Sequence, residues 1–146
     1  MKFLIINGPN LNMLGIREPH FYGSENYSAL CKTIKEACES LDIEYEIYQS
    51  NHEGSIVDKI QDAYSLFDGI VINPAAYTHT SIAILDALKS VRLPAAEVHI
   101  SDVTKREAFR QISYAGMACQ VHVIGQGIAG YVMAAKQLKE QIEGQG

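Results

Sequence analysis

The sequence has no tryptophan and only three cysteines, Cys31, Cys38 and Cys119. An odd number of cysteines without paired spacing argues against a disulfide framework and predicts a reducing, cytoplasmic compartment. No apolar run approaches the roughly 20 residues that a membrane span needs. The first residues also lack the basic region and long apolar core of a secretory signal peptide. No membrane partner is therefore expected.

Basic residues are also scarce. The 146 residues include 12 Lys and Arg against 17 Asp and Glu, which gives a formal net charge of −5. Because no Lys/Arg cluster offsets this charge, nucleic acid is excluded as the main partner. Apolar residues make up 47% of the chain and charged residues 20%, as in ordinary globular proteins. The length favours a single domain over residues 1–146.

Short apolar runs alternate with segments of helical periodicity along the whole chain. Strands are predicted at Lys2–Asn7, Ile43–Tyr48, Gly69–Asn73, Ala95–Ile100 and Gln120–Ile124, and helices from an N-cap at Ser24 to about Leu41, at Ser55–Leu66, at Thr80–Lys89 and at Ile128–Ile142, with a short helical turn at Glu107–Ile112. This alternation predicts an α/β fold of three α/β/α layers, in which helices cover both faces of a parallel sheet. The flavodoxin-like, doubly wound, five-stranded order 2-1-3-4-5 is the first choice at this length.

The segment of residues 8–23, GPNLNMLGIREPHFYG, is too long for a tight turn. Connections in compact domains are usually about 4–6 residues long, and much longer ones are often binding loops or lids. One interpretation is an ordinary polar surface loop. The other is a lid that brings Arg17 beside Tyr22. A nearby cation favours the phenolate, so a phenol that ordinarily titrates near pH ~10 becomes a usable base.

Two further polar segments follow the third and fourth predicted strands. They are NPAAYTHTS at residues 73–81 and EVHIS at residues 97–101, and Arg106 and Arg110 come shortly after the second. In a doubly wound sheet, ligands lie beyond the carboxyl ends of the strands, where the strand order reverses. Alternation places Glu97 and His99 on one side of their strand, so the carboxylate can set the charge or tautomer of the imidazole. These segments predict a catalytic site at this edge.

The chain resembles the type II 3-dehydroquinate dehydratases in three motifs taken together: GPNLNMLGIREPHFYG, NPAAYTHTS, and EVHIS followed by REAFR. The match runs almost from end to end. The resemblance implies a lyase that dehydrates 3-dehydroquinate to 3-dehydroshikimate by anti elimination through an enolate. This reaction serves the shikimate pathway of aromatic amino-acid biosynthesis or the quinate pathway. The resemblance further implies no cofactor, no metal and no lysine Schiff base, and a homododecamer made of four trimers.

The resemblance also implies roles for individual catalytic residues. Tyr22 would be the base that removes the proton alpha to the ketone, and Arg17 would lower its pKa. Asn10 would hold the water that stabilises the enolate oxygen. His99, oriented by Glu97, would protonate the departing hydroxyl.

Six further positions match substrate-binding residues of the family: Asn73, His79, Asp86, Ile100, Ser101 and Arg110. The resemblance implies that the backbone amides of Ile100 and Ser101, with the Ser101 hydroxyl, take the substrate carboxylate. Asn73, His79 and Arg110 would hold the ring hydroxyls. Asp86 would reach the active site of the neighbouring subunit.

The segment Ser113–Val123 departs most from the family pattern. Many members have a Ser-Pro pair and a glycine there, whereas this chain has Gly116-Met117 and Val121. His122 is also unusual, and it is interpreted as a packing or surface variant. These differences bear on subunit contacts and stability more than on the reaction.

Other functions fit the residues less well. The segment Gly125–Gly130 has the G-x-G-x-x-G spacing of dinucleotide-binding proteins, but the chain ends before the required βαβ unit and acidic residue. Close helix–sheet packing, or anion binding at a helix N-terminus, also explains these glycines. A phosphoacceptor receiver would need acidic residues at the ends of strands 1 and 3, where this chain has Asn7 and Asn73. A flavin-binding electron carrier would need a Ser/Thr-rich phosphate loop after strand 1, but that loop contains Pro, Asn, Arg and Tyr. His79, His99 and Glu97 leave a metal hydrolase conceivable. A non-catalytic binding module is the main alternative.

Overall fold

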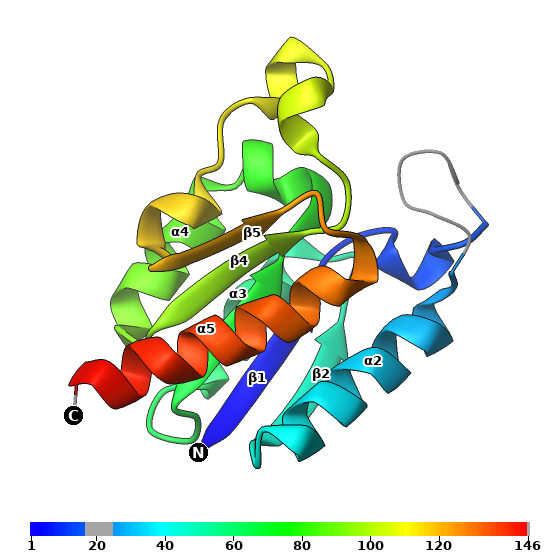
Figure 1. The fold of residues 1–146 in the computed structure, drawn as a ribbon. Coiled ribbons are helices and arrows are strands. Elements are labelled where there is room, and N and C mark those ends of the chain that lie inside the picture. The colour runs from blue at the N-terminus through cyan, green and yellow to red at the C-terminus, as the bar shows by residue number, and fades with distance from the viewer. Residues whose placement is uncertain (17–24, 146) are drawn as a thin grey trace.

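The computed structural model describes residues 1–16 and 25–145. Its strands form one five-stranded parallel sheet in the order β2-β1-β3-β4-β5. The strands are β1 (Lys2–Asn7), β2 (Glu44–Gln49), β3 (Gly69–Asn73), β4 (Ala95–His99) and β5 (Val121–Ile124), and the helices are α2 (Tyr27–Ser40), α3 (Glu53–Asp62), α4 (Ile82–Val91) and α5 (Gly130–Gln145). Figure 1 shows helices on both faces of the sheet. The predicted fold class and strand order are confirmed.

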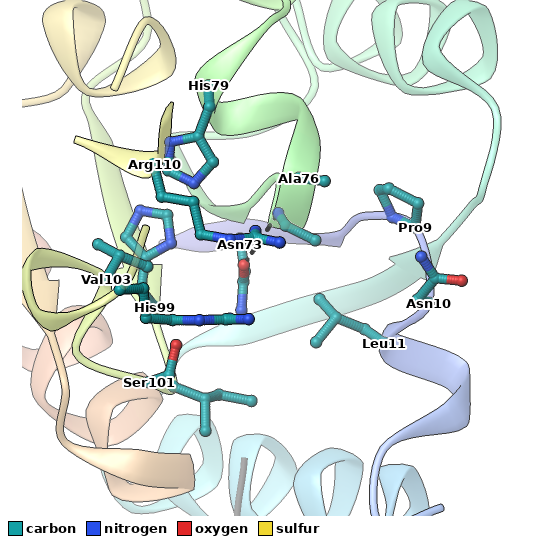
Figure 2. Close-up of a pocket in the computed structure, with 13 residues that line it drawn as sticks. Pro9, Asn10, Leu11, Asn73, Ala76, His79, His99, Ser101, Val103 and Arg110 are labelled. Atoms are coloured by element: carbon teal, nitrogen blue, oxygen red, sulfur yellow. Dashed lines mark hydrogen bonds between the residues drawn. The ribbon is translucent and has the colours of Figure 1, made fainter. Parts of the chain in front are cut away.

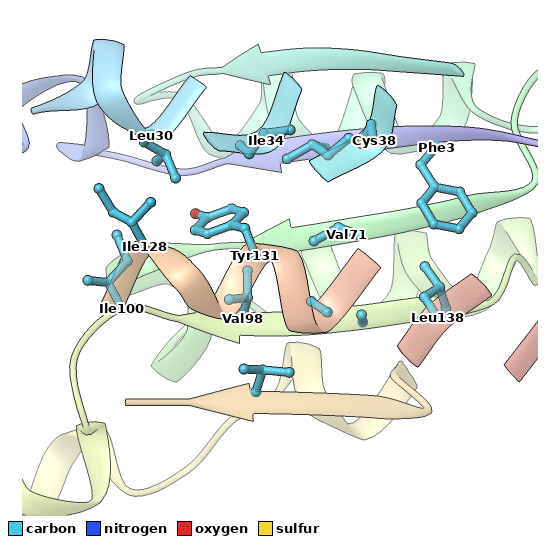
Figure 3. Packing of buried hydrophobic residues seen from close by; sticks show 14 of the residues in the cluster. Phe3, Leu30, Ile34, Cys38, Val71, Val98, Ile100, Ile128, Tyr131 and Leu138 are labelled. Carbon is cyan, nitrogen blue, oxygen red and sulfur yellow. The ribbon is translucent and has the colours of Figure 1, made fainter. Parts of the chain in front are cut away.

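Two apolar cores fill the space between the sheet and its helices. The central strands are buried on both faces, which parallel strands with helices on each side require. Alternation sends Phe3 toward α2 and α5, and Leu4 toward α3 and α4. In the first core, Tyr131 and Leu138 of α5 pack with residues of α2 (Figure 3). The buried strands therefore hold their carboxyl ends in a fixed arrangement.

Helix ends and faces differ from the sequence prediction in several places. Ser24 lies outside the described residues, and the N-cap of α2 is instead Asn26, whose Oδ1 accepts a hydrogen bond from the Ala29 amide at 2.9 Å. The helical spacing of the sequence predicts Val132 on the buried side of the segment Ile128–Ile142 and Tyr64 on that of Ser55–Leu66. In the structure α5 buries Tyr131 and Leu138, and Val132 is 37% exposed. Tyr64 lies beyond the end of α3 and is 67% exposed.

The connection from β4 to β5 consists of short 3-10 turns at Val103–Lys105, Ala108–Arg110 and Ala115–Ala118. The turn predicted at Glu107–Ile112 is thus shorter than expected. Residues 103–110 project beyond the sheet in Figure 1. Among the helices of residues 1–16 and 25–145, none has the length and apolar character to cross a membrane.

Candidate active site

A cavity of about 150 Å³ lies where the carboxyl ends of β1, β3 and β4 meet (Figure 2). Its walls come from the loop after β1, the turn after β3, the end of β4 and the 3-10 turns that follow it. Seven predicted site residues line this cavity: Asn10, Asn73, His79, His99, Ile100, Ser101 and Arg110. The expectation that these distant segments meet at one edge is confirmed.

The remaining predicted site residues lie elsewhere. Glu97 lies behind His99 and contacts it directly. Asp86 is exposed on α4 and is not among the residues that line the cavity. Arg17 and Tyr22 lie outside the described residues. Arg106, with a side chain that is only 4% exposed, also lines the cavity.

A buried carboxylate supports His99. Nε2 of His99 lies 2.9 Å from Oε2 of Glu97, and the two side chains are 5% and 4% exposed. The same Oε2 accepts a hydrogen bond from the Ser113 hydroxyl at 2.7 Å. Burial raises the pKa of Glu97, but the hydrogen bonds from His99, Ser113 and His122 and the charge of His99 outweigh it and hold this pKa at about 2. Glu97 is therefore an anion at neutral pH.

The ionised carboxylate fixes the tautomer of His99. An ionised carboxylate only accepts hydrogen bonds, so Nε2 of His99 carries a hydrogen and donates it. Nδ1 is then the ring nitrogen that gains or releases a proton. His99 is thus arranged as a general acid or base whose exchangeable proton is on Nδ1.

The sequence interpretation missed the role of His122. Its Nδ1 lies 2.6 Å from Oε1 of Glu97, so His122 is more than a packing or surface variant. The contact follows from the sheet register, which pairs His122 with Glu97 across β4 and β5 and is seen only in the structure. Gly116 leaves the space for this arrangement, since a Cβ at that position would lie 2.4 Å from Glu97 Oε1. Two of the departures in residues 113–123, Gly116 and His122, therefore lie at the carboxylate that orients His99.

A second buried polar cluster lies beneath the cavity and supports Asn73. Asn73 donates from Nδ2 to the Tyr131 hydroxyl at 3.0 Å, and that hydroxyl donates to Oδ1 of Asn7 at 2.7 Å. The Asn7 amide in turn donates to the Tyr27 hydroxyl at 3.3 Å. Oδ1 of Asn73 accepts the amide of Ala75 at 3.1 Å. These bonds fix the Asn73 amide at the cavity wall.

The glycine segment after β5 orients the end of β4. Gly125 and Gly127 donate their amides to the carbonyl oxygens of His99 and Ile100, each at 3.0 Å. In a trans peptide the N–H points opposite to the carbonyl, so the amides of Ile100 and Ser101 point away from the glycines, toward β3. Gly125 has φ +79° and lies so close to Asp102 that a Cβ would be 3.1 Å from the Asp102 Cβ. The glycine spacing thus serves backbone packing around the site.

His79 has a defined hydrogen-bonding state. Its Nδ1 lies 2.8 Å from the carbonyl oxygen of Ile112 and therefore donates to it. Burial lowers the pKa of His79, and the positive charges of His99 and Arg110 lower it further, against the opposing effect of Ile112 and Glu97. A neutral imidazole that donates from Nδ1 has a lone pair on Nε2. His79 can accept a hydrogen bond from a ligand hydroxyl.

Two guanidinium groups add positive charge to the cavity. Arg110 Nε lies 3.1 Å and Arg106 Nε 3.5 Å from Oε1 of Glu107. Their guanidinium groups lie on the wall of the cavity, where they can attract an anionic ligand. Among the residues that the structure describes, no group of three or more His, Cys, Asp and Glu is arranged to hold a metal ion.

The chain is similar in sequence and in fold to proteins that are already known. Residues 1–139 match the family described as dehydroquinase class II. The 3-dehydroquinate dehydratase of Clostridium acetobutylicum is 51% identical over 142 residues, which cover 97% of this chain and 99% of that protein. The crystal structure of the type II dehydroquinase from Butyrivibrio crossotus superimposes with a TM-score of 0.93 at 58% identity, covering 95% of this chain and 97% of the other. That of the enzyme from Propionibacterium acnes gives 0.88 at 35% identity, with 97% and 96% covered.

Proposed function

The chain belongs to the class II dehydroquinase family, and on that premise we propose that it removes water from 3-dehydroquinate to give 3-dehydroshikimate. The observation that carries this proposal is the buried pair of Glu97 and His99 at the wall of a cavity that is rich in anion-binding groups. A dehydratase needs an acid for the departing hydroxyl, and an imidazole held by an ionised carboxylate meets that need.

The cavity supports a specific binding mode for the substrate. The substrate carboxylate lies against the amides of Ile100 and Ser101, which point away from the glycine segment. The Ser101 hydroxyl adds a further donor on the same wall. On the opposite side, His79 accepts and Asn73 and Arg110 donate hydrogen bonds to the ring hydroxyls. This arrangement leaves His99 facing the hydroxyl that departs.

The reaction then needs a base on the other face of the ring, and Tyr22 is the proposed group. Tyr22 takes the proton alpha to the ketone, and Arg17 favours the phenolate that this step requires. Two other phenols near the site are unsuitable, because burial raises the pKa of Tyr27 to about 12 and raises that of Tyr131 far above its ordinary value. Tyr27 and Tyr131 therefore remain protonated.

The elimination proceeds in two steps through an enolate. First, the alpha C–H bond breaks, its proton passes to the Tyr22 oxygen, and the ketone becomes an enolate that a water held by Asn10 stabilises. Second, the enolate reforms the ketone, the C–O bond breaks, and the hydroxyl leaves as water with the Nδ1 proton of His99. Because base and acid act on opposite faces, the elimination is anti.

The proposal includes assembly and location. Asp86 is exposed on α4 and outside the cavity of its own chain, a position suited to contact with a neighbouring subunit. We expect trimers, four of which make a dodecamer. The free thiols of Cys31, Cys38 and Cys119 support a cytoplasmic location.

A spectrophotometric assay with 3-dehydroquinate tests the proposal. We expect the ultraviolet absorbance of the conjugated enone product to rise, with or without a chelator and with or without borohydride pretreatment. Tyr22→Phe should remove nearly all turnover and leave substrate binding largely intact, because it deletes only the base. Tyr64→Phe, at a tyrosine that is 67% exposed, is the matched control and should behave as wild type.

Different results would reject different parts of the proposal. A Tyr22→Phe variant with the wild-type rate would exclude Tyr22 as the base. Inhibition by borohydride in the presence of substrate would indicate an imine, and inhibition by a chelator a metal. A folded wild-type protein that binds 3-dehydroquinate without turnover would be a binding module.

A further inference from the structure

Glu97 contacts two imidazoles, one at each of its carboxylate oxygens. Oε2 lies 2.9 Å from Nε2 of His99, and Oε1 lies 2.6 Å from Nδ1 of His122. The two histidines differ in surroundings, because the His99 side chain is 5% exposed and that of His122 is 45% exposed. The buried carboxylate thus links the site histidine to one that is in contact with solvent.

We propose that His122 is a positioning residue for the acid step, which acts through Glu97 and sets the pH range in which His99 delivers its proton. This inference rests on the proposed function, in which His99 is the acid. His122 does not line the cavity and so has no direct contact with a bound substrate. Its influence passes through the Glu97 carboxylate.

The first part of the argument is geometric. Oε2 of Glu97 accepts hydrogen bonds from His99 and Ser113. Among the described residues, His122 is the hydrogen-bond partner of Oε1. A carboxylate that is held at both oxygens cannot rotate about its final side-chain bond without breaking a charge-assisted hydrogen bond. The orientation of Glu97 in turn fixes the ring of His99. His122 therefore holds His99 in place through the one residue between them, Glu97.

The second part is electrostatic. The negative charge of Glu97 stabilises the protonated form of His99 and makes it release its proton less readily. The N–H of His122 donates a hydrogen bond to the same carboxylate, which reduces the negative charge that Glu97 presents to His99. His122 therefore weakens the hold of Glu97 on the His99 proton, in comparison with a Glu97 that has no partner at Oε1.

Few other groups face this carboxylate. His99 and Ser113 share one oxygen, and the thiol of Cys119 stays protonated because burial and the charge of Glu97 raise its pKa to about 12. His79 and Arg110 lie at the cavity and affect the same region through space. Among these groups only His122 combines direct contact with Glu97 and access to solvent.

The test compares His122→Val with His122→Gln by measuring kcat and KM across pH. We expect His122→Val to lower kcat at the wild-type optimum about five- to tenfold, the size expected for one hydrogen bond, with KM little changed. The high-pH limb of its kcat profile should move to higher pH, because Glu97 then holds the His99 proton more tightly. His122→Gln keeps a neutral donor and should restore most of kcat. His52→Gln, at another exposed histidine, is the matched control.

NMR titration of the His99 imidazole gives a readout that is independent of turnover. We expect the titration midpoint of His99 to rise in His122→Val and not in His52→Gln. If the wild-type protein turns over but neither the high-pH limb nor this midpoint moves, the inference is wrong, even if kcat falls. If the midpoint moves in a protein without dehydratase activity, the coupling of His122 to His99 is established, but the proposed function fails and with it the role of His122 in an acid step.

Discussion

Two polar clusters support the cavity from opposite faces of the sheet, and they use different chemistry. The acid cluster (Glu97, His99, Ser113 and His122) lies on the face that α4 covers, where Glu97 pairs with Ile72. The amide cluster (Asn7, Tyr27, Asn73 and Tyr131) lies on the face that α2 and α5 cover. Only the acid cluster holds an anion and imidazoles.

The difference reflects what each cluster must do. A residue that gives up a proton needs partners whose charge stabilises one protonation state over the other, which neutral amides do weakly. A residue that only holds a ligand hydroxyl needs a fixed position, which neutral hydrogen bonds supply without the cost of burying charge. Under the proposed function, the acid cluster tunes the proton transfer by His99, and the amide cluster holds Asn73 in position. Substitutions in the two clusters should separate these functions.

The largest expected effect is on turnover, from Glu97→Gln. This change keeps the size of the side chain but removes its negative charge. It also replaces one accepting oxygen by an NH2 group, which faces partners that themselves donate hydrogen bonds. We expect kcat to fall by about 10²–10⁴, the range of a lost general acid, while KM changes little because Glu97 does not line the cavity. Steady-state kinetics with 3-dehydroquinate measures both. A wild-type kcat in this variant would remove the reason to treat the acid cluster as catalytic.

The next effect is on stability in acid. Glu97 has a pKa of about 2 against an ordinary 4.5, so the unfolded chain binds its proton first as the pH falls. The stabilisation is complete above pH 4.5 and is lost as the pH falls toward 2, with an upper limit on the order of 3 kcal/mol. Urea unfolding at several pH values should show wild type and Glu97→Gln converging with acid. Glu36→Gln, at an exposed carboxylate, should leave the pH dependence of wild type unchanged.

Much of the fold and part of the candidate site could be predicted from the sequence. Uninterrupted apolar strands and the helical spacing between them predicted the sheet, and the rule for carboxyl ends placed Asn73, His79 and His99 together. These inferences work because they depend on chain connectivity and burial, which the sequence states directly. The Glu97–His99 contact followed from period-two alternation in one strand.

What sequence reasoning missed depends on pairing between strands. His122 meets Glu97 only because β4 and β5 align in one register, which the sequence of either strand leaves open. The bond between Asn7 and Tyr131 joins residues 124 positions apart. The predicted face of the last helix was wrong at Val132, because the buried side of α5 runs through Tyr131, Ala134 and Leu138 and leaves Val132 37% exposed. Local sequence patterns do not predict contacts between residues that lie far apart in the sequence.

The smallest effect, and the sharpest test of the comparison, comes from Tyr131→Phe in the amide cluster. Loss of the hydroxyl leaves Asn7 Oδ1 and Asn73 Nδ2 without their buried partner, and such a loss costs about 1–3 kcal/mol. We expect the free energy of unfolding in urea to drop by that amount and KM to rise as Asn73 loosens. The pH profile of kcat should stay where it is, because the cluster carries no charge.

Tyr64→Phe, at an exposed tyrosine, controls for the loss of a hydroxyl. A shifted pH limb in Tyr131→Phe would show that the two faces share the task of tuning His99, and the division between them would no longer hold.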